Sequence, residues 1–256
     1  MAVEVVGRDV EIGALSAFLD RRGAVRGPIA IALEGDAGIG KSTLWRAAVE
    51  EARGRGWRVL SSRPAETEQA LAHAGLGDLL DGVLDEVLPA LTAPRRRALE
   101  VALLIEDAPG GGVDQRALGV AVRSALELLA EDGLVIAIDD LQWLDATSAS
   151  AVGFALRRLP EADISLLWTR RLGEPQQSTA VEDALDDRVE RIRVGPLSVG
   201  VRRASADAST STSRVGASKP SRRAETSSSS RSGTGSGCVE SGTAPSAPSA
   251  RASSSA

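Results

Sequence analysis

The sequence predicts an α/β fold in which a parallel sheet is covered by helices on both faces. Two observations support this fold class. Short apolar stretches alternate with helical patterns along most of the chain, as expected where helices connect parallel strands. The stretch "GLVIAIDD" (133–140) is almost continuously apolar up to its two acids. Such a run is typical of a strand that is buried on both faces.

The first elements follow from the spacing of apolar residues. Residues 7–23, "GRDVEIGALSAFLDRRG", have helical spacing and end at Gly23. "PIAIALEG" (28–35) is expected to be a short buried strand, and "KSTLWRAAVEEARGRG" (41–56) the helix that follows it. "WRVLSS" (57–62) is expected to be the second strand.

The later elements continue the alternation. Residues 65–131 contain three helical patterns, interrupted at Pro89, at Pro94 and at "DAPGGGVD". After the strand at 133–140, a helix is expected over 147–159 and a fourth strand at "ISLLWTRR". "RVERIRVGPLS" contains a fifth strand.

The end of the chain has a different composition. Residues 201–256 contain no Leu, Ile or aromatic residue, and roughly a third of them are Ser. Such a segment cannot bury enough apolar surface to offset backbone ordering, which costs about 1–2 kcal/mol per residue. We therefore expect a folded domain over residues 1–199 and a disordered tail over 200–256.

Two interpretations of the tail remain: a flexible linker or an artificial end. Leu and Ile stop abruptly after Leu197. Ser codons of the TCN type that alternate with Thr codons of the ACN type become NTC and NAC codons when they are read one base earlier. These encode Leu, Ile, Val or Phe alternating with Asp, Asn, His or Tyr. We favour the hypothesis that the chain is frameshifted or truncated after about residue 199.

The charge and the rare residues narrow the class of protein. The tail carries a net charge of +5 and the whole chain −5, which leaves about −10 on the first 200 residues. An acidic domain argues against direct nucleic-acid binding. Cys238 is the only cysteine, and His73, the only histidine, is expected to have a packing or surface role. With no signal peptide and no apolar run of about 18 residues, we expect a cytoplasmic protein without membrane contact.

A phosphate-binding loop is the strongest motif. Gly35, Gly40, Lys41 and Ser42 match G-x-x-x-x-G-K-[ST] between a predicted strand and a predicted helix. The glycines let successive backbone N–H groups point at phosphate oxygens, and the helix that follows adds its positive end. The expected binding residues are Gly35, Asp36, Ala37, Gly38, Ile39, Gly40, Lys41, Ser42 and Thr43.

The loop predicts the phosphate groups of a nucleotide, together with Mg²⁺, as ligands. Lys41 would neutralise the β- and γ-phosphates, and the hydroxyl of Ser42 would bind Mg²⁺. Asp139 and Asp140 end a buried strand, where open parallel sheets bind ligands. Asp139 would bind Mg²⁺, and Asp140 would orient or deprotonate the attacking water, so that Lys41 and Asp140 are the expected catalytic residues. Alternatively, either acid only caps the following turn.

Two further expectations concern rate and sensing. An Asp in the water-positioning role is one methylene shorter than a Glu, so we expect slow hydrolysis, which suits a switch better than a motor. Thr169 and Arg170 end the strand "LLWTRR" and could contact the γ-phosphate. Arg170 or Arg171 could equally be a solvated strand end.

Five motifs in their order resemble a known family: "VGRDVEIGAL", "EGDAGIGKSTL", "IDDLQWLDATSA", "LLWTRR" and "VGPLS". Together they resemble the nucleotide-binding domain of STAND-type ATPases, in the AAA-like group of P-loop NTPases. The similarity is closest to large ATP-binding transcription regulators of the LuxR type and covers residues 4–199. "RPAETEQALAHAGLGDLLDGVLDEVLPAL" resembles that family's helical insert.

The resemblance implies a P-loop NTPase three-layer sandwich with a five-stranded parallel sheet, in which the Thr169 strand lies between the Gly35 and Asp139 strands. It implies switching between resting and oligomer-competent states as ATP is exchanged or hydrolysed. Gly7 and Arg8 match a box near the nucleotide, and "GPLS" matches the start of a helical lid. The family's lid contacts, helical sensor region and DNA-binding helix-turn-helix have no counterpart in this sequence.

Other functions remain open. The chain could be a scaffold that binds ATP to fix a protein-interaction surface without meaningful hydrolysis. A small-molecule kinase usually closes a basic lid over the phosphates, and no such basic segment precedes residue 200. The expected partners are ATP and ADP, together with a second copy of the chain or a partner protein.

Overall fold

The computed structural model describes residues 7–21, 23–107, 112–173 and 179–197. The chain separates into two compact units, residues 1–212 and 213–256, and all described residues belong to the first. The predicted tail, residues 200–256, and Ser198 of the expected lid start lie outside the described residues.

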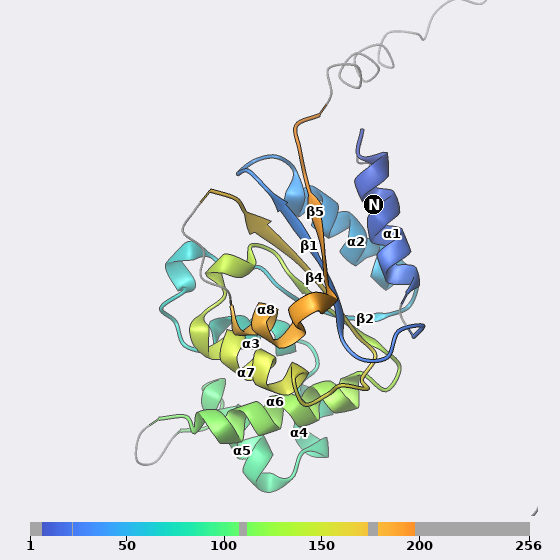
Figure 1. Cartoon of the computed structure of the whole chain (residues 1–256). Helices are drawn as coiled ribbons and strands as arrows, with labels where there is room; N and C mark the ends of the chain where they lie inside the picture. Colours follow the sequence, from blue (N-terminus) through green and yellow to red (C-terminus); the bar gives the residue numbers. More distant parts are fainter. Residues whose placement is uncertain (1–6, 22, 108–111, 174–178, 198–256) are drawn as a thin grey trace, which may run out of the picture. The chain divides into compact units, whose positions relative to one another are not determined.

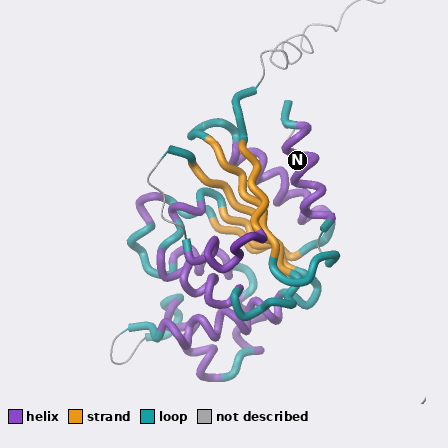
Figure 2. Tube along the Cα trace, viewed as in Figure 1, coloured by secondary structure: helices purple, strands orange, loops and turns teal. Residues whose placement is uncertain are grey.

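Five parallel strands form one sheet in the order β2-β3-β4-β1-β5. Figure 2 shows these strands as one twisted layer with helices beside it. Both the predicted α/β class and the predicted place of β4, between β1 and β3, are confirmed. The strands are β1 (Ile29–Gly35), β2 (Arg58–Ser62), β3 (Leu134–Ile138), β4 (Ile164–Arg171) and β5 (Val189–Arg193).

The register brings three strand ends to the same edge of the sheet. Thr169 of β4 is paired with Leu33 of β1, and Trp168 is paired with Ile138, the last residue of β3. Asp139 comes directly after β3, so it lies next to Thr169 at the carboxyl edge. Gly35 ends β1 at the same edge, paired with Arg171. The parallel sheet therefore gathers the predicted site residues from distant parts of the sequence.

One face of the sheet is covered by α1 (Asp9–Asp20) and α2 (Lys41–Gly54), drawn in blue in Figure 1. Their apolar side chains, including Phe18 and Leu44, pack in one core with Ile31 and Leu33 of β1. Alternate residues of a strand point to opposite faces, so Ala30 and Ala32 belong to the core on the other side. This pattern explains why the central strands are apolar throughout.

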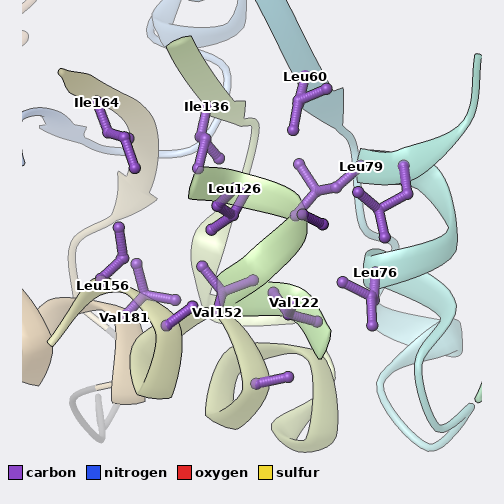
Figure 3. Close-up of a cluster of buried hydrophobic side chains, with 14 of the residues drawn as sticks. Leu60, Leu76, Leu79, Val122, Leu126, Ile136, Val152, Leu156, Ile164 and Val181 are labelled. Atoms are coloured by element: carbon purple, nitrogen blue, oxygen red, sulfur yellow. The ribbon is translucent and has the colours of Figure 1, made fainter. Parts of the chain in front are cut away.

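On the other side of the sheet the remaining helices form two layers, and Leu84–Ala90 and Ala93–Ala102 pack outside Gln115–Leu129 (Figure 1). Leu60, Ile136 and Ile164 of the sheet pack in one core with residues of these helices, among them Leu126 and Val152 (Figure 3). The helices are α3 (Ala74–Leu80), α4 (Leu84–Ala90), α5 (Ala93–Ala102), α6 (Gln115–Leu129), α7 (Ala146–Leu156) and α8 (Ala180–Leu185).

Residues 65–131, which we call the insert from here on, form four α-helices rather than the three helical segments that were expected. Gly82, with φ of 77°, separates α3 from α4, and this left-handed conformation ends a helix readily only at glycine. Pro89 lies inside α4, which ends one residue later, and Pro94 lies in the first turn of α5, where proline is tolerated.

Three short 3₁₀ turns complete the described structure: η1 (Glu66–Glu68), η2 (Leu141–Trp143) and η3 (Asp186–Arg188). Among the described residues, no helix has both the length and the apolar character that crossing a membrane requires.

Candidate functional site

The predicted phosphate loop connects β1 to α2. Gly38 and Gly40 have φ of 73° and 104°, a left-handed conformation that favours glycine. A Cβ atom on Gly35 would lie 2.6 Å from the backbone oxygen of Val194, which follows β5, so a larger residue would push these segments apart. At Gly38 and Gly40, a Cβ would meet nothing within 4 Å. The loop is therefore tightly packed at its start and open at its centre.

Lys41 is the first residue of α2, and its side chain turns back over the loop. Its Nζ donates hydrogen bonds of 2.9 Å to the backbone oxygens of Gly35 and Asp36. Burial lowers the pKa of Lys41, an effect that nearby Asp140 opposes and Arg171 reinforces. The loop thus holds a largely buried ammonium group at its centre.

The next residue connects the loop to the sheet edge. Ser42 Oγ donates to Asp139 Oδ1 at 3.0 Å, and Thr169 Oγ1 donates to the same oxygen at 2.8 Å. Asp139 is buried, with Oδ2 lying 3.5 Å from Arg63 Nε. Arg63 is not among the residues predicted from the sequence, where its only signal is its position directly after β2.

Asp140 is held by its backbone as well as by its side chain. Its N–H donates to Thr169 Oγ1 at 2.7 Å, and Gln142 Nε2 donates to Asp140 Oδ1 at 2.9 Å. Its φ of 61° is unusual for a residue other than glycine, although Asp tolerates it better than most. Such backbone conformations cost about 1–3 kcal/mol and cluster at functional sites.

Two consecutive arginines at the end of β4 have different surroundings. Arg170 is buried and pairs with Glu182 of α8, which is also buried. Arg171 stacks on Trp143, its guanidinium carbon 4.1 Å from the ring centroid, and its Nε lies 3.5 Å from Asp140 Oδ1. Neighbouring strand residues face opposite ways, so Arg171 lies beside Asp140, whereas Arg170, the predicted phosphate contact, lies beside Glu182.

Of the two predicted N-terminal residues, Arg8 contacts the loop. Arg8 is buried, and its Nη2 donates to the backbone oxygen of Ile39 at 2.9 Å. Its Nη1 pairs with Glu11 Oε1 at 2.8 Å. Gly7 precedes it with φ of 75°. Arg8 thereby fastens the start of α1 to the loop.

A pocket of about 210 Å³, which we call the loop pocket, opens among these residues. It combines the ammonium of Lys41 and the guanidinium of Arg171 with the carboxylate of Asp140. Of the other predicted residues, Asp36 and Ala37 are exposed on the loop and Ile39 is half-buried. The loop pocket is lined by Gly38, Gly40, Lys41, Ser42, Thr43, Asp140 and Arg171.

A second polar cluster connects the insert to the segment after Asp140. The buried carboxylate of Asp145 caps α7 by accepting from Ser148 N at 2.9 Å, and it also accepts from His73 N and Gly75 N, both at 3.0 Å. Burial alone would raise the pKa of Asp145, but hydrogen bonds from Ser148, Thr147 and Gly75 outweigh it and lower the pKa. This contact was not predicted from the sequence, although an Asp three residues before Ser148 is a recognisable helix cap.

The side chains of the site offer hard oxygen ligands for a metal ion and a positively charged group for an anion. Within the described residues, no group of three or more His, Cys, Asp or Glu side chains is placed to hold a metal ion. Ser42 Oγ and Asp139 Oδ1, which lie 3.0 Å apart, suit a cation that takes its other ligands from water and phosphate.

Comparison with known proteins gives one family. Residues 4–169 match a family described as "AAA ATPase domain". No curated protein matches the chain.

Several solved structures are similar to the chain. AMPPCP-bound DnaA from Aquifex aeolicus is 18% identical over 83% of this chain and 53% of its own, with a TM-score of 0.43. The Aeropyrum pernix ORC1 protein in complex with DNA is 16% identical over 80% of this chain and 49% of its own, with a TM-score of 0.47. The E. coli MS115-1 HORMA:CdnC:Trip13 complex contains a chain 14% identical over 81% of this chain and 69% of its own, with a TM-score of 0.47. This chain spans about half the length of the DnaA and ORC1 chains.

Proposed function

This chain belongs to the AAA ATPase domain family, and we propose that it is an ATP-binding, slowly hydrolysing signalling switch. One observation carries the proposal: the loop, the Asp139 strand end and the Thr169 strand end are joined by hydrogen bonds through one carboxylate oxygen. A nucleotide that occupied the loop pocket would contact all three segments at once.

The residues present fit ATP with Mg²⁺. Open space at Gly38 and Gly40 leaves room for phosphate beside the loop N–H groups, and the buried Lys41 supplies positive charge. Ser42 and Asp139 would hold Mg²⁺, directly or through water. When bound, Mg²⁺ would neutralise negative charge on the phosphates.

The proposed roles of the chain's own residues follow from their placement. Lys41 would release its bonds to the backbone oxygens of Gly35 and Asp36 and bind phosphate oxygens. Asp140 would orient or deprotonate the attacking water from a position fixed by Thr169 and Gln142. The short reach of an Asp side chain supports slow turnover.

The proposed γ-phosphate sensor now has two components. Thr169 contacts both acids, so a shift of the strand end on loss of phosphate would move them together. Arg171 lines the loop pocket, whereas Arg170 is paired with Glu182. We therefore propose that Arg171 contacts phosphate and that Arg170 would do so only after leaving Glu182.

The finer parts of the function rest on the sequence resemblance. We propose that the ATPase domain spans residues 1–199 and comes from a STAND-type, LuxR-like transcription regulator. We further propose that it exchanges ATP and ADP, associates with another copy or a partner protein, and resides in the cytoplasm.

A specific alternative is an ATP-gated scaffold that does not hydrolyse ATP to a useful extent. The contact between Asp140 and Arg171 favours it, because Arg171 Nε lies 3.5 Å from the carboxylate oxygen Oδ1, which hydrolysis would need free for the attacking water. The two functions share the binding site and differ only in the use of Asp140.

The variant Asp140→Asn separates these functions and, because Asn tolerates φ of 61°, preserves the backbone. ATP affinity and phosphate release would be measured for both proteins. The switch predicts measurable release by the wild type and a loss of roughly 10²–10⁴-fold in the variant, with binding retained. Tight binding without release by the wild type would instead support the scaffold, and absence of binding would refute both.

A further inference from the structure

A second and larger cavity lies within the helical insert. We call it the insert pocket; its volume is about 880 Å³. It is lined by residues 71–74, by the last part of α5 and residues 103–105, and by residues 112, 113 and 115 at the start of α6. Gly77, Leu84 and Thr147 complete the lining. It shares no residue with the loop pocket.

The mouth of the insert pocket concentrates exposed apolar surface. Five large hydrophobic side chains are exposed among the described residues, and three of them line this pocket. They are Leu71, Leu104 and Ile105, with Leu104 being 91% exposed. Leu104 also has φ of 58°, which leucine rarely adopts. Apolar surface gathered around a hollow in this way typically marks a binding site.

The pocket has a polar end. His73 is buried, and its Nε2 lies 3.2 Å from Nε2 of Gln115. Burial lowers the pKa of His73 against the opposing effect of Asp145, so the ring is neutral at neutral pH. A neutral imidazole beside an amide offers both a donor and an acceptor to a ligand.

The charge of the lining selects the class of ligand. None of the fifteen lining residues is Asp, Glu, Lys or Arg. A charged ligand would lose its hydration without gaining a partner of opposite charge, at a high energetic cost.

We propose that the insert pocket binds a neutral, mostly apolar small molecule with one hydrogen-bonding group, which His73 and Gln115 recognise. Its volume lies within the range of about 300–1,000 Å³ typical of small-molecule sites. Because His73 is buried, an occupant must enter the pocket to contact it. The flat surface of a partner protein would not enter. The site goes beyond the proposed nucleotide binding and does not depend on it.

The probe for this site is N-phenyl-1-naphthylamine, a neutral apolar fluorophore with one N–H group. Titrated into the full chain, it is expected to show saturable fluorescence with one site per chain. The blocking variant is Gly77→Leu, because a Cβ on Gly77 lies an acceptable 3.9 Å from Leu103 and the longer side chain fills the pocket. The matched control is Gly13→Leu in α1, where a Cβ meets nothing within 4 Å.

A second pair of variants covers the case in which Gly77→Leu does not fold. Ile105→Asp places a charge at the mouth on a side chain that is 53% exposed, and Val10→Asp makes the same change on an 82% exposed side chain in α1. We expect probe affinity to fall at least about tenfold in both pocket variants and to stay unchanged in both controls, which is a difference of about 1.4 kcal/mol.

Three outcomes would overturn the proposal. The wild type could fail to bind the probe saturably, or both pocket variants, shown to be folded by circular dichroism, could bind it as well as their controls. Sedimentation gives the third outcome. If the wild type self-associates without binding the probe, and the pocket variants do not self-associate, the occupant is a second copy of this chain.

Discussion

The hydroxyl of Thr169 donates to Oδ1 of Asp139 across 2.8 Å, which joins the ends of β4 and β3. The same hydroxyl accepts from the backbone N–H of Asp140 at 2.7 Å. A single buried side chain therefore positions both acids of the candidate site, and Ser42 connects the first acid to the loop.

The first prediction concerns Thr169→Val, which keeps the shape of the side chain and removes the hydroxyl. The N–H of Asp140 then loses its acceptor, so we expect the free energy of unfolding to fall by about 1–3 kcal/mol. Urea denaturation followed by circular dichroism measures this difference. Thr169→Ser is the control, because it keeps both hydrogen bonds, and equal stability of the Val variant and the wild type would contradict the network.

The second prediction concerns Asp145 and pH. Its folded pKa lies below its ordinary value of 3.8, so ionised Asp145 stabilises the fold above that value. The stabilisation is lost as the pH falls through the lower folded pKa. Asp145→Asn removes the carboxylate, and the difference in unfolding free energy between the two proteins should be largest near pH 7 and shrink below pH of about 3.8.

Denaturant titrations at several pH values test this second prediction. The control is Asp163→Asn, which removes a carboxylate near the surface. That carboxylate accepts a hydrogen bond from the backbone N–H of Gly23 at 3.2 Å. A difference between the wild type and Asp145→Asn that does not change between pH 7 and pH 3 would argue against a carboxylate-specific contact between α7 and the insert.

The third prediction separates the two arginines of β4. Arg171→Ala should weaken ATP binding and leave unfolding nearly unchanged, since Arg171 lines the loop pocket and its side chain is 30% exposed. Arg170→Ala leaves Glu182 buried without this cation, so it should lower the free energy of unfolding by about 3–5 kcal/mol. Nucleotide titration and urea denaturation of both variants give the comparison, and the reverse pattern would assign the phosphate contact to Arg170.

Much of the fold could be predicted from sequence because its signals are local. The strand at 134–138 is apolar on both faces, and the loop motif fixes where β1 ends and α2 begins. The insert was harder to predict, because α3 and α4 have only 7 residues each and the conformation of Gly82 decides whether they are one helix or two.

The residues of the candidate site could be predicted where one local motif contains them. They were harder to predict where segments that are distant in the sequence meet. Lys41 follows from the loop motif, and Asp139 follows from its place at the end of a predicted strand. The pairing of Arg170 with Glu182 depends on how α8 packs, and the contact of Arg63 with Asp139 depends on strand order. Neither partner leaves a pattern in the local sequence. The roles of all these residues in catalysis remain predictions.

The measurement that tests the central claim most directly is an isothermal titration of ATP with Mg²⁺ into the wild type and Lys41→Ala. Losing a charge-assisted contact of about 1.5–3 kcal/mol should weaken binding roughly 10- to 150-fold. Arg53→Ala is the control, because it removes the same charge from an exposed position at the other end of α2. Equal ATP affinity of Lys41→Ala and the wild type would contradict the assignment of residues 35–43 as a phosphate-binding loop.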